Sequence, residues 1–221
     1  QTIAEGLAPV VNWAPLMDFS IQSLTLFISL VLIAVTCILM GAGLPTTALY
    51  IMLATVAQPA LGNLGVPPLA AHLFVLYYGV ISEITPPVCA SAYAAAGIAG
   101  ANPFRTGISA FSLGIAKLMV PMVFVYSPAM LIVIESHFTW AAFFSTVVSC
   151  AIGVFMVATA VAGFFMAPLG PLGRAGMVLA GVLLVAPGIT SDMYALAVCF
   201  PVIVHQLMIR KAYALKEAAG T

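Results

Sequence analysis

Two short segments carry oxygen ligands at points where an apolar helix is interrupted. The first is Gly-Ala-Gly-Leu-Pro-Thr-Thr at residues 41–47, and the second is Ile-Thr-Pro-Pro at residues 84–87. A proline has no amide hydrogen and clashes with the carbonyl four residues before it, so Pro45, Pro86 and Pro87 disfavour helical hydrogen bonds at both places. We therefore expect backbone carbonyls and neighbouring hydroxyls to be available there as ion ligands.

The ligands at both breaks are neutral oxygens, which suit an alkali cation such as Na⁺ bound by unwound backbone. Zinc and calcium instead favour Cys, His or several carboxylates, and the four cysteines and three histidines of the chain show no ligand spacing. The sequence thus predicts a Na⁺ site rather than a site for a tightly bound metal. Its predicted residues are Gly41, Gly43, Pro45, Thr46, Thr47, Thr85, Pro86 and Pro87.

Glu83 directly precedes the second break. A charged side chain at membrane depth costs at least ~2.5–3.5 kcal/mol on insertion scales unless it is hydrated or paired. We expect Glu83, with Ser82 and Ser91, to line a substrate or ion cavity. Two alternatives stay open, an acid at a hydrated helix end and an acid paired with a distant cation. Because a carboxylate can also carry a proton, coupling to H⁺ in place of Na⁺ stays open too.

The composition indicates a membrane protein, because 64% of the 221 residues are hydrophobic and 5% are charged. Crossing about 30 Å of hydrocarbon takes roughly 20 apolar residues, and residues 19–40, 107–134 and 139–166 each suffice. The net charge is zero, and no basic cluster precedes the C-terminus, so nucleic acid is not an expected partner. No Ser-His-Asp set, phosphate loop or metal motif is present, so we expect no enzyme. The predicted fold is an all-α polytopic membrane protein.

The breaks and spans divide the chain into four parts. Residues 1–18 suit a loop or interfacial segment, and residues 19–103 form the half of a transport domain. Within that half we expect a broken helix at 19–61 and a re-entrant helical hairpin at 68–100, because its arms of roughly 25 and 20 Å are short for two full spans.

Residues 104–166 predict two long transmembrane helices with a boundary at 135–137. Residues 167–221 predict an apolar hairpin, turning near 187–192, and a cytoplasmic tail. Arg210, Lys211 and Lys216 after the last apolar run place the C-terminus on the cytoplasmic side by the positive-inside rule. Lys117 lies inside a span, where it could extend to the interface or pair with an acid.

Four segments resemble, in order and spacing, the large permease subunit of TRAP transporters, in particular the fused permeases of the TAXI branch. The segments are GAGLPTTA at 41–48, GVPPLAAHLF at 65–74, ITPPV at 84–88 and AAAGIAG at 94–100. The resemblance covers about residues 20–134. Residues 135–221 agree only in general hydropathy and in a Pro-Gly turn at 187–188.

The resemblance implies a Na⁺-driven carrier in the inner membrane of a bacterium or archaeon, which takes up an organic acid delivered by an extracytoplasmic substrate-binding protein. Such permeases are similar to elevator-type carriers with two inverted repeats, of which this chain resembles the second. The second sodium site of the family would lie between residues 41–47 and 85–87, and no cofactor beyond the coupling ion is implied.

The chain begins at Gln1 without a signal-peptide pattern, so we expect it to be part of a longer polypeptide. A first repeat and a small-subunit equivalent would then be needed for transport. An ion channel and a non-transporting membrane scaffold are the alternatives. A channel would need a continuous polar pore lining or rings of charge, and a scaffold would have no need for two oxygen-rich breaks.

Overall fold

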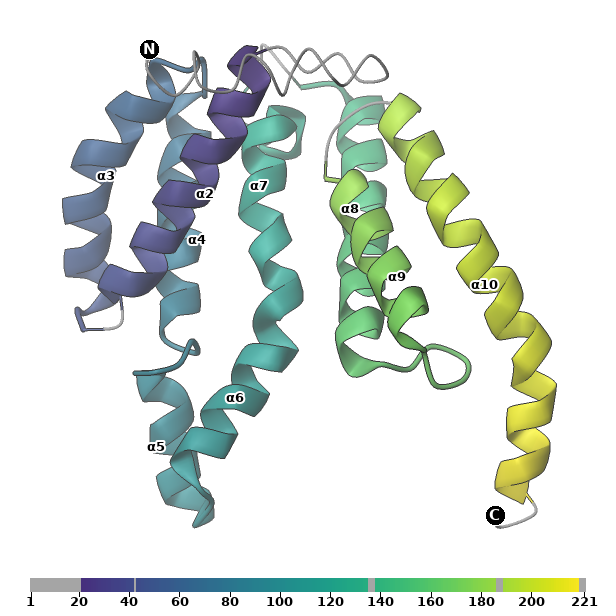
Figure 1. Ribbon diagram of the computed structural model, residues 1–221. Coiled ribbons are helices and arrows are strands. Elements are labelled where there is room, and N and C mark those ends of the chain that lie inside the picture. Colours follow the sequence, from purple (N-terminus) through teal and green to yellow (C-terminus); the bar gives the residue numbers. More distant parts are fainter. Residues whose placement is uncertain (1–20, 42, 135–137, 186–188, 219–221) are drawn as a thin grey trace. The chain divides into compact units, whose positions relative to one another are not determined.

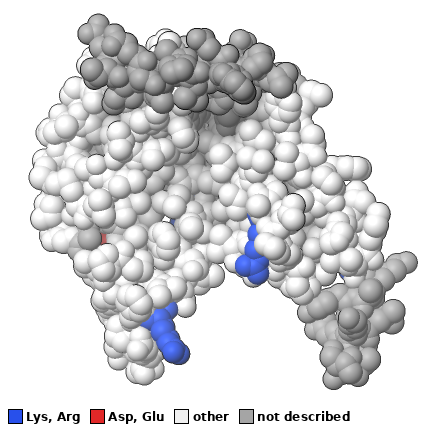
Figure 2. Space-filling model, in the orientation of Figure 1, with Lys and Arg blue, Asp and Glu red and all other residues white. Residues whose placement is uncertain are grey.

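The computed structural model describes residues 21–41, 43–134, 138–185 and 189–218, the last eight and residues 189 and 190 by backbone alone. These residues form helices and no named strand, and four helical stretches are long and apolar enough to cross a membrane. The prediction of an all-α polytopic membrane protein is confirmed. Figure 2 shows the few charged side chains as isolated patches among described residues that are otherwise uncharged on this face.

The chain forms two compact units that divide between residues 107 and 108. The first unit begins with α2 (Ile21–Gly41) and α3 (Thr46–Gly62). The two helices run in opposite directions and contact each other (Figure 1). Ile33 and Thr36 of α2 line a shared groove with Leu53 and Val56 of α3, as expected for an antiparallel pair that turns near residues 42–45. These two helices are therefore a helical hairpin.

The next two helices of the first unit are α4 (Pro68–Ser82) and α5 (Ala90–Ala99). Figure 1 shows α5 beyond the end of α4 and not folded back beside it. At 1.5 Å per residue the two pieces measure about 22 and 15 Å, so end to end they form one discontinuous helix about as long as a membrane crossing.

The sequence analysis assigned the hairpin and the broken helix in the opposite order, and this was wrong. The predicted hairpin at 68–100 is the discontinuous helix, and the predicted broken helix at 19–61 is the hairpin. The error arose because two short arms fit a hairpin and a single interrupted span equally well by length.

Helix α4 packs against both arms of the hairpin. The core of this unit is apolar and includes these fully buried side chains: Leu30, Cys37, Leu49, Leu61 and Phe74. After α5 the chain turns at Gly100, which has a positive φ of 64°, and α6 (Pro103–Gly114) begins. The amide of Arg105 is bound by the Asn102 side chain at 3.1 Å, which caps the start of this helix.

Helix α6 crosses the boundary into the second unit and continues as a 3₁₀ turn, η1 (Ile115–Leu118), and α7 (Met119–Tyr126). A second 3₁₀ turn, η2 (Pro128–Met130), follows. The helix therefore ends at Tyr126, earlier than the expected residue 134, because Ser127 has φ −130° and ψ 75° and the residue before a proline disfavours the helical region.

The remaining helices are α8 (Trp140–Ala162), α9 (Pro171–Leu183) and α10 (Ile189–Ala218). Helix α9 packs against both α8 and α10 around a common core: Met156, Ala160, Met177, Ala180 and Cys199. With 13 residues, α9 is about 20 Å long and too short to cross 30 Å of hydrocarbon. The predicted C-terminal hairpin consists of α9 and α10. Of these two helices, α10 is long and apolar enough to cross a membrane, over Ser191–Arg210.

Three predictions fall outside the described residues: the segment 1–18, the boundary at 135–137 and the Pro187–Gly188 part of the last turn. The four cysteines are free and buried at separate places. They contribute to apolar packing.

Candidate functional site

The two breaks predicted from sequence meet within the first unit. Thr46, the first residue of α3, donates its hydroxyl hydrogen to Oε1 of Glu83 at 2.5 Å. Ser91 in the first turn of α5 donates to the other carboxylate oxygen, Oε2, at 3.2 Å. The carboxylate thus connects the tip of the hairpin with both halves of the discontinuous helix.

Glu83 occupies this position because α4 ends there. Its amide still bonds to the carbonyl of Val80 at 3.2 Å, and the amides of Ile84 and Thr85 bond to the carbonyls of Ile81 and Ser82 at 3.1 and 3.0 Å. These are three-residue turns that tighten the end of the helix. The carbonyl of Ser82, expected to be free, therefore has one partner and keeps one lone pair.

A second close contact between the breaks lies at Gly41, the last residue of α2. A Cβ atom at this position would overlap the Oγ of Ser82 and lie 2.6 Å from its Cβ and 2.8 Å from Cδ2 of Leu49. Glycine is required here because two helix ends and a hairpin arm approach each other without space for a methyl group.

Ser82 lines this contact and not an open cavity. Its side chain is 1% exposed, and its hydroxyl donates to the carbonyl of Gly79 at 2.5 Å. Thr85 is similarly engaged, since its hydroxyl donates to the carbonyl of Ile81 at 2.9 Å. Both oxygens retain lone pairs, but their hydrogens are already used within α4.

The other predicted ligands lie at the margin of the site. Gly43, Pro45 and Thr47 are exposed at the hairpin tip, while Pro86 is half-buried and Pro87 exposed in the second break. The structure thus brings together five predicted residues, Gly41, Thr46, Ser82, Glu83 and Ser91, and does not bring these others to the carboxylate.

Sequence reasoning missed Tyr93. Its hydroxyl donates to the carbonyl of Pro87 at 2.5 Å and so ties the first two turns of α5 back to the break. The available signal was a single hydroxyl-bearing aromatic residue within a helix of small residues, six positions after Pro87. Among the described residues, no three His, Cys, Asp or Glu side chains gather to hold a metal ion. Glu83 and neutral oxygens therefore define the chemistry of this site.

Comparison with known families gives one finding. Residues 14–140 match the family model of the DctM component of the tripartite ATP-independent periplasmic transporters. The match takes in the hairpin, the discontinuous helix and α6 to α7, and it ends where α8 begins. No curated protein and no solved structure matched the chain.

Proposed function

Since the chain belongs to the DctM family of tripartite ATP-independent periplasmic transporters, we propose that it contributes a Na⁺ site, centred on Glu83, to the uptake of an organic acid. Membership of this family establishes that the chain is part of a multi-pass transporter permease. The family is one of transporter permeases and not of enzymes. The coupling ion, the substrate and the bacterial or archaeal inner membrane belong to the proposal.

The observation that carries the proposal is the contact of Thr46 and Ser91 with the two oxygens of Glu83, at 2.5 and 3.2 Å. A carboxylate at membrane depth needs a partner, and two neutral hydroxyls leave its negative charge uncompensated. A monovalent cation bound by the carboxylate, both hydroxyl oxygens and carbonyls of the break would neutralise that charge. Discontinuous helices of secondary transporters bind Na⁺ in this way.

A proton on Glu83 is the second candidate for the coupling ion. The same carboxylate would be neutralised by protonation, and it would then donate to one hydroxyl and accept from the other, which needs no further ligand. The geometry of the three side chains fits either ion. The two differ in whether stability and uptake respond to Na⁺ itself.

The family description calls the transporter tripartite, which implies partners for the DctM component. We propose a substrate-binding protein on the extracytoplasmic side, a small subunit and a first permease repeat. The substrate would be a small organic anion. Driving its entry with Na⁺ offsets the repulsion of an anion by an interior-negative membrane potential.

The orientation of the second unit follows from its charges. The amide of Ala167, in the loop after α8, donates to Oε1 of Gln206 in α10 at 3.0 Å, so this loop lies beside the C-terminal part of α10. Arg174 and Arg210 belong to this end of the unit, while Phe138 and Trp140 lie at the opposite end of α8. The positive-inside rule assigns the arginine end to the cytoplasm.

The test uses the intact transporter, purified and measured for thermal unfolding in NaCl against choline chloride at equal ionic strength. Na⁺ at about 100 times its dissociation constant stabilises a binding protein by ~2.7 kcal/mol. We expect this stabilisation in the wild type and in Thr47→Ala, whose exposed side chain lies next to the site, and its loss in Thr46→Ala and Glu83→Gln. Na⁺ stabilisation that survives Glu83→Gln would refute the site.

Uptake in proteoliposomes with the substrate-binding protein then separates the two ions. An imposed Na⁺ gradient drives uptake if the proposal is correct. Uptake driven by a proton gradient alone, and lost in Glu83→Gln, would assign the coupling to H⁺.

A further inference from the structure

Lys117 is an ionisable residue in the middle of a span, and the proposed Na⁺ site makes no use of it. The span Pro103–Tyr126 has 24 residues, so at 1.5 Å per residue the Cα atom of Lys117 lies about 4 Å past its midpoint. Helical side chains lean toward the N-terminus, and for Lys117 this direction is back toward the midpoint. The nearer end, at Tyr126, is about 13 Å away in the opposite direction. Extension to the interface, one of the two alternatives from sequence, is therefore disfavoured.

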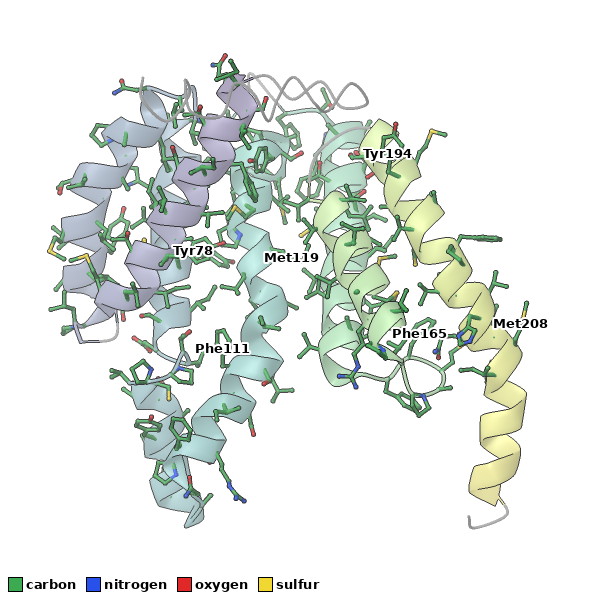
Figure 3. All side chains as sticks on the ribbon, in the orientation of Figure 1. Tyr78, Phe111, Met119, Phe165, Tyr194 and Met208 are labelled. Atoms are coloured by element: carbon green, nitrogen blue, oxygen red, sulfur yellow. The ribbon has the colours of Figure 1, made fainter. Side chains whose placement is uncertain are left out.

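The helix is also interrupted where Lys117 lies. The 3₁₀ turn η1 (Ile115–Leu118) joins α6 to α7, and Figure 3 labels Phe111 and Met119 on the two sides of it. A 3₁₀ turn inside a long helix often marks a functional position. Here it turns Ala116 into the protein, at 5% exposure, and leaves Lys117 exposed.

The exposed surface of α6 before Lys117 includes polar side chains. Ser109 and Ser112 are exposed on α6 within the two turns before the 3₁₀ segment. The second unit has one acid whose side chain is described, Asp192 in the first turn of α10, and Lys117 forms no ion pair with it. The positive charge near the middle of this candidate span is thus uncompensated within the described part of its unit.

We propose that Lys117 binds the carboxylate of the transported organic acid during its passage through the membrane. This inference rests on the proposed function, in which the substrate is an organic anion. A lipid phosphate is not the partner, because headgroups lie about 15 Å from the middle of the hydrocarbon. The ammonium group offers three hydrogen-bond donors and a full positive charge, which match a carboxylate that has left water.

The experiment measures binding of a fixed panel of straight-chain mono- and dicarboxylates, of three to eight carbons, to the intact transporter. Ligand-induced shifts of the unfolding temperature are compared for wild type, Lys117→Met and Lys117→Arg. Met has nearly the same length without the charge, and Arg keeps the charge. Leu113→Met is the matched control, because Leu113 lies one turn earlier on α6 and is 85% exposed.

We expect Lys117→Met to weaken binding of the best carboxylate about tenfold or more, the effect of losing one charge-assisted hydrogen bond. Lys117→Arg and Leu113→Met should bind within about twofold of wild type, a difference far below that of one such bond. Equal affinity of wild type and Lys117→Met would overturn the inference and leave the Na⁺ site intact. If no carboxylate stabilises the wild type while Na⁺ does, the organic-acid part of the proposed function is wrong and the inference falls with it.

Discussion

The contact between Gly41 and Ser82 makes a sharp prediction about the Gly41→Ala variant. The added Cβ would lie 2.6 Å from Cβ of Ser82 and 2.8 Å from Cδ2 of Leu49, whereas carbon atoms pack at about 3.5–4.0 Å. The hairpin tip and the end of α4 must therefore separate by roughly 1 Å. Overpacking of this kind costs typically ~1–3 kcal/mol.

The same displacement acts on the carboxylate site. The hydroxyl oxygen of Thr46 and Oε1 of Glu83 are 2.5 Å apart where the hairpin tip meets the end of α4. A further 1 Å would take these two atoms to about 3.5 Å, where a hydrogen bond between oxygens is weak. We therefore expect Gly41→Ala to lower the free energy of unfolding by ~2 kcal/mol and to weaken any response to Na⁺.

Gly43→Ala is the matched control. It lies two residues later in the same tip, and a Cβ atom there would meet no atom within 4 Å. We expect this variant to change the free energy of unfolding by less than about 0.5 kcal/mol, as for most surface substitutions. The assay is reversible unfolding of the purified protein in mixed micelles, with both variants measured under the same conditions.

A second-site change tests the cause. Ser82→Gly removes both Ser82 atoms that the new methyl group would meet, so the double variant Gly41→Ala/Ser82→Gly should be more stable than the sum of the single effects predicts. A coupling energy of ~1 kcal/mol or more is typical of residues in contact. The reasoning is refuted if Gly41→Ala and Gly43→Ala are equally stable, or if the two changes at residues 41 and 82 are additive.

Three further predictions concern the second unit. Gly181→Ala should cost ~1–3 kcal/mol, because its Cβ would lie 2.9 Å from a backbone oxygen of α8, while Gly170→Ala, with no atom within 4 Å, should be near neutral in the same unfolding assay. Gln206→Leu should cost ~1–3 kcal/mol by leaving a buried amide of the α8–α9 loop unpaired, and faster proteolysis of that loop would show it. Thr139→Ala should cost ~1 kcal/mol, since its hydroxyl caps the amide of Ala142 at 3.2 Å; helix-end hydrogen exchange that does not change would contradict this role.

The sequence was sufficient to predict where the helices are interrupted, because proline disfavours the helical hydrogen bonds at both places. It did not predict the path of the chain through them. The chain runs in opposite directions in α2 and α3, on the two sides of the first break. It keeps its direction across the seven-residue break from Glu83 to Cys89, between α4 and α5. Proline and glycine content marks an interruption, but the direction after it depends on which apolar faces pack together, and that is a property of the folded unit.

The predicted ligands differ in their contacts for a related reason. Thr85 and Thr46 each lie beside a proline in a break, but Thr85 follows the last turn of α4 and Thr46 begins α3. A hydroxyl at the end of a helix finds a carbonyl one turn earlier, as Thr85 does with Ile81. A hydroxyl at the start of a helix has no preceding turn, so Thr46 remains available for Glu83. Helix polarity therefore decides which threonine contacts the acid.

This polarity also gives the proposed coupling a physical basis. A threonine hydroxyl both donates and accepts hydrogen bonds, so Thr46 can donate to the Glu83 carboxylate when no cation is bound. When a cation binds to the carboxylate, the O–H bond can rotate away and turn a lone pair toward the ion. With or without the cation, Thr46 connects the hairpin tip to the end of α4. The bound cation attracts both the carboxylate and the hydroxyl oxygen, which adds to the hold of the hydrogen bond alone. The position of the tip would then depend on occupancy through one rotation about a side-chain bond, with no rearrangement of either helix.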